Sequence, residues 1–294
     1  MDFESIQKRI GNTPIIEVEE GIYCKLESYN PFGSVKDRVA FFMLEDAYKK
    51  SLINEETTII EATSGNTGIA LAAICKELGL KCIIVMPDNV NIERVEIVNK
   101  YGADVIKTPA IFGMSGAIDM ANDMALEIKN SYIPSQFKNK ACVTAHYKTT
   151  GPEIYNDMPD VDIIVCGIGT GGTITGISKY IKRKNDCIVV GVEPQGSPFL
   201  SKNKVGTHKI LGIGAGFLPD ILDLDLVDEI IAISDQEAIE GMKMLNSNNI
   251  SSGISAGAAY MASRKIKEEN KGKKILFILP DDSKKYESLG YLRG

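Results

Sequence analysis

A buried strand, a glycine-rich turn and the start of a helix follow one another in the stretch Asp162-Ile163-Ile164-Val165-Cys166-Gly167-Ile168-Gly169-Thr170-Gly171-Gly172-Thr173. Residues 162–166 are almost all apolar, which is typical of a strand covered on both faces of a parallel sheet. Residues 175–184 have the pattern of a helix that continues from the turn. Because parallel neighbours need such crossover helices, this stretch predicts an α/β fold.

The same alternation of short β-branched runs and amphipathic helical stretches recurs along the chain. Further strands are predicted at 57–61, 81–86, 104–106, 188–192, 230–233 and 275–279. Further helices are predicted at 39–48, 68–78, 92–101, 115–129, 236–245 and 256–269. The pattern predicts two open, twisted sheets of parallel type with helices on both faces. The polar stretch 134–152 is the predicted junction, which divides the chain into domains 1–147 and 148–294.

Length and charge exclude several classes of protein. The chain has 294 residues, 44% of them hydrophobic, with 33 basic and 39 acidic side chains and a net charge of −6. An acidic balance argues against binding to nucleic acid or to an anionic membrane, which needs clustered Lys and Arg. No apolar run approaches the roughly 18 residues of a membrane span, and the first residues are acidic, unlike a signal peptide. We therefore expect a cytoplasmic location.

Histidine and cysteine usage limits the chemistry further. His146 and His208 are the two histidines of the sequence, so a histidine-rich metal site is excluded. The six cysteines form no C-x-x-C pair and lie in apolar stretches, which indicates buried, reduced thiols. The acidic residues of 223–228 lack the ligand pattern of a calcium loop, because Val227 stands where an oxygen ligand is needed. The sequence predicts no metal site.

The turn at 30–38 places a lysine at the predicted start of a helix. Ser34 is a candidate N-cap, and Asp37 stands at the spacing of a capping box. Lys36 would then lie in the first helical turn, where the positive end of the helix dipole disfavours a protonated amine. A neutral amine is the form that a nucleophilic lysine requires. The alternative is an ordinary surface lysine beside a cap.

A second turn, Thr63-Ser64-Gly65-Asn66-Thr67-Gly68, connects a predicted strand to a helix. Free amides at a helix start, two glycines and four polar side chains favour an anion site suited to a carboxylate. An ordinary polar loop between strand and helix is the alternative.

The third turn, 167–173, matches the pattern G-x-G-x-x-G directly after a strand. With Glu193 at the end of the next strand, it could bind the ribose and pyrophosphate of a dinucleotide. The same turn could equally bind a single phosphate, with the hydroxyls of Thr170 and Thr173 assisting the backbone N–H groups. The pattern alone does not distinguish the two.

A fourth motif, Gly253-Ile254-Ser255-Ala256-Gly257, has the form of a hydrolase nucleophile elbow. In that fold the catalytic histidine follows the serine along the chain, whereas both histidines here precede Ser255. A serine hydrolase is therefore excluded.

Two anion-binding turns and two polar residues at helix starts have one joint explanation. Pyridoxal phosphate needs a phosphate site, a lysine for a Schiff base and a partner for its pyridine nitrogen, and its amino-acid substrate needs a carboxylate site. With these features the sequence resembles the cysteine synthase (O-acetylserine sulfhydrylase) and cystathionine β-synthase family of fold-type II pyridoxal-phosphate enzymes. The similar stretches run in order along nearly the whole chain, at 10–14, 25–27, 30–38, 63–68, 136–137, 149–154, 167–173, 192–194, 212–217 and 253–257.

The resemblance implies the tryptophan synthase β-like fold and a role for each matching residue. Lys36 would form the Schiff base and exchange the α-proton of the substrate, Asn66 would bind the ring hydroxyl of the cofactor, and Ser255 would meet the pyridine nitrogen. The phosphate would be held by Gly169, Thr170, Gly171, Gly172 and Thr173. The substrate carboxylate would be held by Thr63, Ser64, Thr67 and Gln136.

The implied reaction is β-replacement on a three-carbon amino acid, with O-acetyl-L-serine and sulfide giving L-cysteine and acetate. An alternative uses the same chemistry on L-cysteine and releases hydrogen sulfide. Members of the family are usually homodimers, and some bind the tail of serine acetyltransferase. From other classes, an NAD-dependent oxidoreductase and a cofactor-free binding module remain open, although neither gives Lys36, Asn66 and Ser255 a shared purpose.

Several stretches depart from the family pattern where substrate choice is made. The chain is shortened between Pro14 and Lys25, which trims an N-terminal hairpin. Residues 89–95, 248–252 and 283–285 also differ from the usual family sequence. The extra polar residues around Asn91 could position a water molecule, which motivates the alternative that starts from L-cysteine. These departures leave the reaction class intact.

Overall fold

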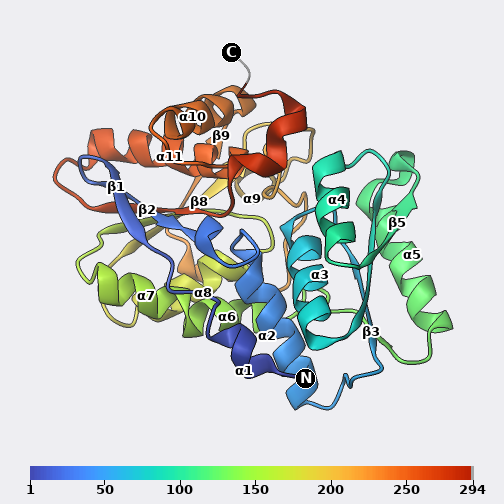
Figure 1. Cartoon of the computed structure of the whole chain (residues 1–294). Coiled ribbons are helices and arrows are strands. Elements are labelled where there is room, and N and C mark those ends of the chain that lie inside the picture. The colour runs from blue at the N-terminus through green and yellow to red at the C-terminus, as the bar shows by residue number, and fades with distance from the viewer. Residues whose placement is uncertain (293–294) are drawn as a thin grey trace.

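The computed structural model describes residues 1–292 and contains two β-sheets, each with helices on both faces (Figure 1). The larger sheet has the strand order β1-β2-β10-β7-β8-β9 and the smaller has the order β5-β4-β3-β6. Neighbouring strands are parallel except β1 and β2, which form an antiparallel hairpin. The strands are β1 (Ile15–Glu19), β2 (Ile22–Leu26), β3 (Thr58–Ala62), β4 (Lys81–Pro87), β5 (Asp104–Thr108), β6 (Ser131–Tyr132), β7 (Ile163–Gly167), β8 (Ile188–Pro194), β9 (Glu229–Ile233) and β10 (Ile275–Leu279).

Helices connect the strands and cover the sheets. The α-helices are α1 (Phe3–Gln7), α2 (Lys36–Lys49), α3 (Asn66–Leu78), α4 (Ile92–Lys100), α5 (Gly113–Glu127), α6 (Ala141–Lys148), α7 (Thr150–Asp157), α8 (Gly172–Ile181), α9 (Phe199–Lys202), α10 (Asp235–Ser247) and α11 (Ile254–Glu269). Short 3-10 segments are η1 (Glu27–Tyr29), η2 (Ala110–Phe112), η3 (Leu224–Leu226) and η4 (Ser283–Leu289). Among residues 1–292, none of the helices has the length and apolar content needed to cross a bilayer.

The central strand β10 illustrates why the large sheet needs cover on both faces. All five of its residues are buried. Ile275, Phe277 and Leu279 pack into the core beneath α10 and α11, whereas Leu276 and Ile278 pack with α7 and α8 on the opposite face (Figure 1). Because successive side chains of a strand point to opposite faces, an uninterrupted apolar run requires two apolar layers.

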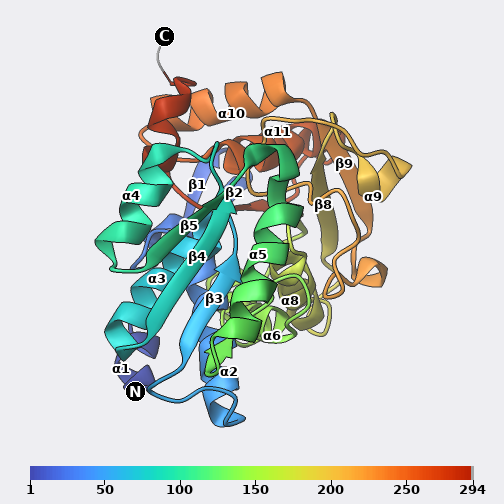
Figure 2. The same cartoon turned by 90° about the vertical axis from the view of Figure 1, so that its right-hand side faces the viewer.

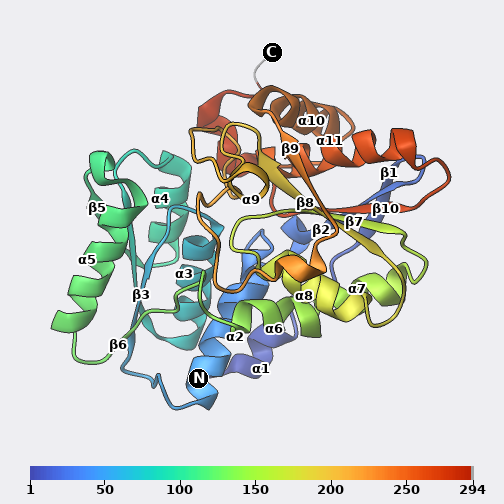
Figure 3. The same ribbon diagram turned by 180° about the vertical axis from the view of Figure 1, so that it is seen from behind.

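The smaller sheet is covered in the same way. Figure 2 shows β3, β4 and β5 with α5 on one side and α3 and α4 on the other. Ile60 and Val85 pack against α5, and Ile59 and Ile84 pack into the core formed with α2 and α3. The view from behind in Figure 3 shows the two sheets side by side, with α2, α3 and α6 between them.

The predicted fold class and all seven predicted strands are confirmed. The sequence patterns missed β1, β2, β6 and the helices α1, α6, α7 and α9. Both α6 and the start of α7 lie within 134–152, where a junction was predicted, so this stretch is largely helical. The sheets also depart from a division at 147/148, because β1 and β2 pair into the large sheet beside β10, with Ile22 opposite Ile275.

Candidate active site

The predicted site residues come together around one cavity of about 440 Å³ between the two sheets. It is lined by segments that follow β3, β7 and β10 and by residues at the starts of α2, α3, α8 and α11. This is the position where open parallel sheets bind ligands. Eleven of the twelve predicted residues line it: Lys36, Thr63, Ser64, Asn66, Thr67, Gln136, Gly169, Thr170, Gly171, Thr173 and Ser255. The twelfth, Gly172, is the first residue of α8 in the same turn.

Lys36 is the first residue of α2, and its half-buried side chain reaches this cavity. Burial lowers the pKa of its ammonium group, while the charges of Asp281 and Glu27 oppose this shift. The direction agrees with the neutral amine expected from the sequence, and burial is its main cause.

The predicted capping box is wrong. The N-cap position is Val35, and the hydroxyl of Ser34 accepts the backbone N–H of Lys36 at 3.2 Å. Asp37 instead turns back and accepts the N–H of Phe32 at 2.6 Å. These two contacts fix the conformation of the turn 32–37, which contains Lys36.

The turn at 167–173 ends at the N-terminus of α8, where backbone N–H groups are free to bind an anion. Gly171 has a φ of 85°, and a side chain there would place its Cβ 2.6 Å from the Cβ of Leu222. The hydroxyl of Thr173 lies 3.2 Å from Nε2 of His146, whose Nδ1 lies 2.9 Å from the Thr150 hydroxyl. Burial lowers the pKa of His146 to about 3, so a neutral imidazole holds Thr173 in place.

Glu193 does not serve this turn. Its buried carboxylate accepts the backbone N–H groups of Leu200 at 2.8 Å and Ser201 at 3.1 Å, and also the hydroxyl of Ser201. The carboxylate that a dinucleotide-binding site would use to bind ribose is therefore already hydrogen-bonded to the first turn of α9. The turn keeps the features of a site for one phosphate.

The loop at 63–67 lies beside Gln136, which is distant in sequence. The Thr67 hydroxyl donates to Oε1 of Gln136 at 2.6 Å. The backbone N–H groups of Ser135 and Gln136 donate to Glu61, at the end of β3, at 2.9 and 3.2 Å. Burial raises the pKa of the Glu61 carboxyl to about 7. Glu61 thus attaches the Gln136 segment to the strand that precedes the loop.

Ser255 is the second residue of α11 and is buried at the cavity. On the other side of the cavity, Nδ2 of Asn66 donates to Oδ2 of Asp281 at 2.7 Å. The Oδ1 atom of Asn66 is buried and has no hydrogen-bond partner among residues 1–292. A polar group bound in the cavity would satisfy it.

Several further residues line the same cavity although no sequence pattern marks them. Arg94 of α4 donates from Nη1 to the carbonyl of Ser64 at 2.7 Å, and its guanidinium lies 5.5 Å from the ring centre of Tyr286. An apolar group at the mouth consists of Met114, Ile118, Phe137 and Phe217. Lone residues inside helices and loops carry no local signal of their role, because only the tertiary fold brings them to the cavity.

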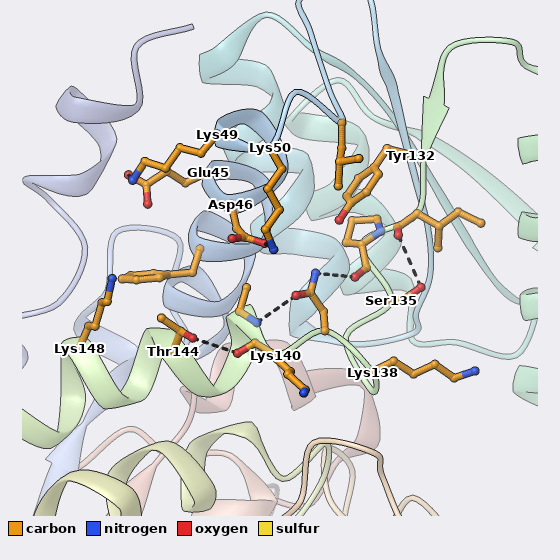
Figure 4. Close-up of a pocket in the computed structure, with 16 residues that line it drawn as sticks. Glu45, Asp46, Lys49, Lys50, Tyr132, Ser135, Lys138, Lys140, Thr144 and Lys148 are labelled. Atoms are coloured by element: carbon orange, nitrogen blue, oxygen red, sulfur yellow. Dashed lines mark hydrogen bonds and ion pairs between the residues drawn. The ribbon is translucent and has the colours of Figure 1, made fainter.

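A second cavity, of about 560 Å³, lies away from these residues (Figure 4). It is formed by the C-terminal half of α2 and by residues 132–148. Lys49 at the end of α2 pairs with Glu45, and the following residue Lys50 pairs with Asp46, each at 2.7 Å. None of the predicted site residues lines this cavity. Chemistry rather than size therefore identifies the site.

The residues of the smaller cavity fit pyridoxal phosphate. They include a lysine whose pKa is lowered, a helix N-terminus for a phosphate, a hydroxyl at a buried helix start and an amide with an unpaired oxygen. Lys36, Asn66, Ser255 and the turn 169–173 are the residues that could hold the cofactor, and the loop 63–67 with Gln136 could hold a carboxylate.

Comparison with known proteins supports this assignment. The family model described as pyridoxal-phosphate dependent enzyme matches residues 6–281. Cysteine synthase B of Campylobacter jejuni is 45% identical over 290 residues, which cover 97% of this chain and 97% of that protein. A hydrogen sulfide-producing enzyme from Fusobacterium nucleatum is 41% identical with a TM-score of 0.92, and covers 96% of this chain and 98% of its own. Cysteine synthase from Entamoeba histolytica is 38% identical with a TM-score of 0.94, and covers 98% and 90%. The chain is therefore a pyridoxal-phosphate-dependent enzyme of fold type II and belongs to the cysteine synthase family.

Proposed function

We propose that this enzyme replaces the acetoxy group of O-acetyl-L-serine with sulfide, which yields L-cysteine and acetate. The observation that carries the proposal is a single cavity lined by Lys36, by the glycine-rich turn around 169–173 and by the loop 63–67. Relatives named cysteine synthase, which match nearly the full length of the chain, support the same reaction.

Each group of residues has a distinct task in this reaction. Bound pyridoxal phosphate withdraws electrons from the α-carbon of the substrate and so acidifies its α-proton. Lys36 takes that proton and later returns it, a task that requires the neutral amine favoured by burial. Ser255 offers the pyridine nitrogen a neutral hydroxyl, which does not force that nitrogen to stay protonated as a carboxylate would. Weaker electron withdrawal favours prompt departure of the β-substituent.

The loop 63–67 and Gln136 bind the substrate carboxylate. Backbone N–H groups at the start of α3 and the hydroxyls of Thr63, Ser64 and Thr67 supply the donors. Arg94, which also lines the cavity, holds the loop through the Ser64 carbonyl. This arrangement would select a substrate that carries a carboxylate.

A second candidate reaction starts from L-cysteine and releases hydrogen sulfide. It is supported by the similarity to the hydrogen sulfide-producing enzyme of Fusobacterium nucleatum. Addition of water in place of sulfide requires a base for that water. Among the cavity-lining residues within 1–292 there is no Asp or Glu, but His208 lines the cavity and its buried Nδ1 atom has no hydrogen-bond partner there, so an imidazole is available as that base. The preference for the synthase reaction rests instead on the relatives named cysteine synthase.

Two measurements test the assignment. Reduction of the holoenzyme with borohydride, followed by digestion and mass spectrometry, should place the pyridoxyl group on Lys36. Lys36→Ala should lose turnover of both substrates, whereas Lys8→Ala, which removes an exposed lysine paired with Glu4, should retain it. A label on another residue, or normal turnover by Lys36→Ala, would overturn the proposal. Faster sulfide release from L-cysteine than synthesis from O-acetyl-L-serine would select the second reaction.

We further infer a homodimer from the family resemblance and a cytoplasmic location from the acidic sequence without a long apolar run. The same resemblance makes the tail of serine acetyltransferase a candidate partner. Light scattering of the purified holoenzyme should give twice the mass of 32.0 kDa. A pull-down with the acetyltransferase tail peptide tests the partner. Absence of binding at saturating peptide would remove it.

A further inference from the structure

Asp281 lies just behind the cavity lining, next to Pro280, and belongs to none of the predicted groups. It follows β10 by two positions, and its side chain is fully buried. Its Oδ2 atom accepts two hydrogen bonds of 2.7 Å, one from Nδ2 of Asn66 and one from the hydroxyl of Tyr286. Its Oδ1 atom is buried without a hydrogen-bond partner among residues 1–292.

The backbone of Asp281 connects two further parts of the site. Asp281 forms an isolated antiparallel bridge with Ser34, and the adjacent carbonyl of Pro280 accepts the N–H of Val35 at 2.9 Å. The carbonyl of Asp281 accepts the N–H of Gly253 at 3.0 Å. Ser34 stands two residues before Lys36, and Gly253 stands two residues before Ser255. Asp281 is thus bonded to each of the three segments that carry Lys36, Asn66 and Ser255.

The side-chain contact decides how the amide of Asn66 is oriented. A carboxylate oxygen accepts hydrogen bonds, so the NH₂ group of Asn66, and not its oxygen, faces Oδ2 of Asp281. With Nδ2 committed to Asp281, the polar atom of Asn66 left without a partner among residues 1–292 is Oδ1. Without this acceptor, the two orientations of the amide would differ little in energy.

We propose that Asp281 is a positioning residue that fixes the orientation in which the side-chain amide of Asn66 meets the ring oxygen of the bound cofactor. This proposal rests on the proposed function, since it uses Asn66 as a cofactor contact. The hydroxyl of Tyr286 donates to the same Oδ2 atom, and the ring of Tyr286 is in turn covered by Arg94. This second donor fixes the carboxylate that the amide of Asn66 meets.

Asp281→Asn is the test variant, because it preserves shape but removes the acceptor-only character of the side chain. Titration of the cofactor-free protein with pyridoxal phosphate should show affinity weakened roughly tenfold, the loss expected for one charge-assisted hydrogen bond. The visible absorption band of the bound cofactor should shift in wavelength and in its dependence on pH. Asp282→Asn, which removes the neighbouring carboxylate that caps η4, should leave both quantities unchanged.

A double-mutant cycle separates positioning from general support of the fold. In an Asn66→Ala background, Asp281→Asn should add no further shift of the band, because the group through which it acts is gone. An equal shift in both backgrounds, or wild-type affinity and spectrum in Asp281→Asn, would overturn the proposal. If Asp281→Asn does not fold, Asp281→Ser provides the same comparison with a smaller side chain.

Failure of this proposal is distinguishable from failure of the proposed function. A wild-type protein without a visible band from a lysine-bound cofactor would contradict the function itself. A normal wild-type band that Asp281→Asn leaves unaltered would contradict only the role of Asp281.

Discussion

Gly171 and Gly272 have nearly the same left-handed backbone, with φ of 85° and 83°, but different surroundings. A Cβ at Gly171 would meet Leu222 at 2.6 Å, whereas a Cβ at Gly272 would meet nothing within 4 Å. Both substitutions to Ala should cost about 1–2 kcal/mol of backbone strain. Gly171→Ala should cost about 1–3 kcal/mol more, because Leu222 must move, and it should displace the phosphate-binding turn.

Urea denaturation of the two cofactor-free variants measures this difference, and titration with pyridoxal phosphate measures the effect on the site. Gly272→Ala should bind the cofactor as the wild type does. Equal stability and equal affinity for the two variants would show that Leu222 yields without cost and that the turn tolerates a side chain.

Thr67 offers a test of the carboxylate-binding loop. Thr67→Val removes the hydroxyl that donates to Gln136 at 2.6 Å and leaves a buried acceptor unpaired. The KM for the amino-acid substrate should rise roughly ten- to a hundredfold, because this contact orients donors for the substrate. The affinity for pyridoxal phosphate should stay constant. Steady-state kinetics measure this KM, with Thr144→Val of α6 as the matched control. A wild-type KM for both variants would contradict the prediction.

At the residue scale, the sequence could predict which side chains meet but not how each is held. Lys36, Ser255 and the turn 169–173 stand at starts of helices, and this local position is visible in the sequence. The burial that lowers the pKa of Lys36 comes from the tertiary fold. The same holds for Asp281 and Arg94, whose partners are distant along the chain. Contacts between residues distant along the chain produce no periodic pattern in the sequence.

A buried ionic cluster connects three elements at the base of α2. Arg38 contacts Glu27, after β2, at 2.7 Å and Glu153 of α7 at 2.6 Å. Lys25 of β2 contacts Glu153 at 2.8 Å, and the Thr13 hydroxyl donates to Glu27. The cluster fixes α2, and hence Lys36, relative to the large sheet. Because α6 and α7 were missed in the polar stretch, the role of Glu153 could not be predicted.

This cluster makes stability depend on acid pH. Burial alone would raise the pKa of Glu27, but Arg38 and its hydrogen bonds lower it to about 2. Since this value lies below the roughly 4.3 of an unfolded glutamate, the stabilisation is present above pH 4.3 and is lost as the pH falls toward 2. The wild-type protein should therefore have a higher free energy of unfolding than Glu27→Gln at pH 6. This difference should decrease by about 3 kcal/mol between pH 6 and pH 2.

Urea denaturation of both cofactor-free proteins at pH 6, 4, 3 and 2 measures that difference. A difference that stays constant, or grows as the pH falls, would contradict a lowered pKa for Glu27. The cluster would then contribute to packing without a net electrostatic contribution.

At the scale of the whole molecule, the first strands of the chain complete a sheet built mainly from its second half. Residues of β2 pair with all five residues of β10, from Ile22 opposite Ile275 to Leu26 opposite Leu279. The alternating charges of β1 and the shortness of the hairpin hid these strands from sequence patterns, which recognise long apolar runs best. The division into domains at 147/148 remains a proposal. The pairing of β1 and β2 with strands of the second half argues against it.

Expression of residues 148–294 alone tests that division directly. The fragment would expose one edge of β10 and the apolar side chains that pack against Ile22, Cys24 and Leu26, all of which are buried in the whole chain. An uncovered apolar strand edge promotes aggregation, so the fragment should be insoluble or lack a cooperative unfolding transition. A second fragment in which residues 13–29 are linked ahead of 148–294 restores β1 and β2 and should recover solubility. Cooperative unfolding of 148–294 without them would instead support a boundary at 147/148, because the second half would then form its own core.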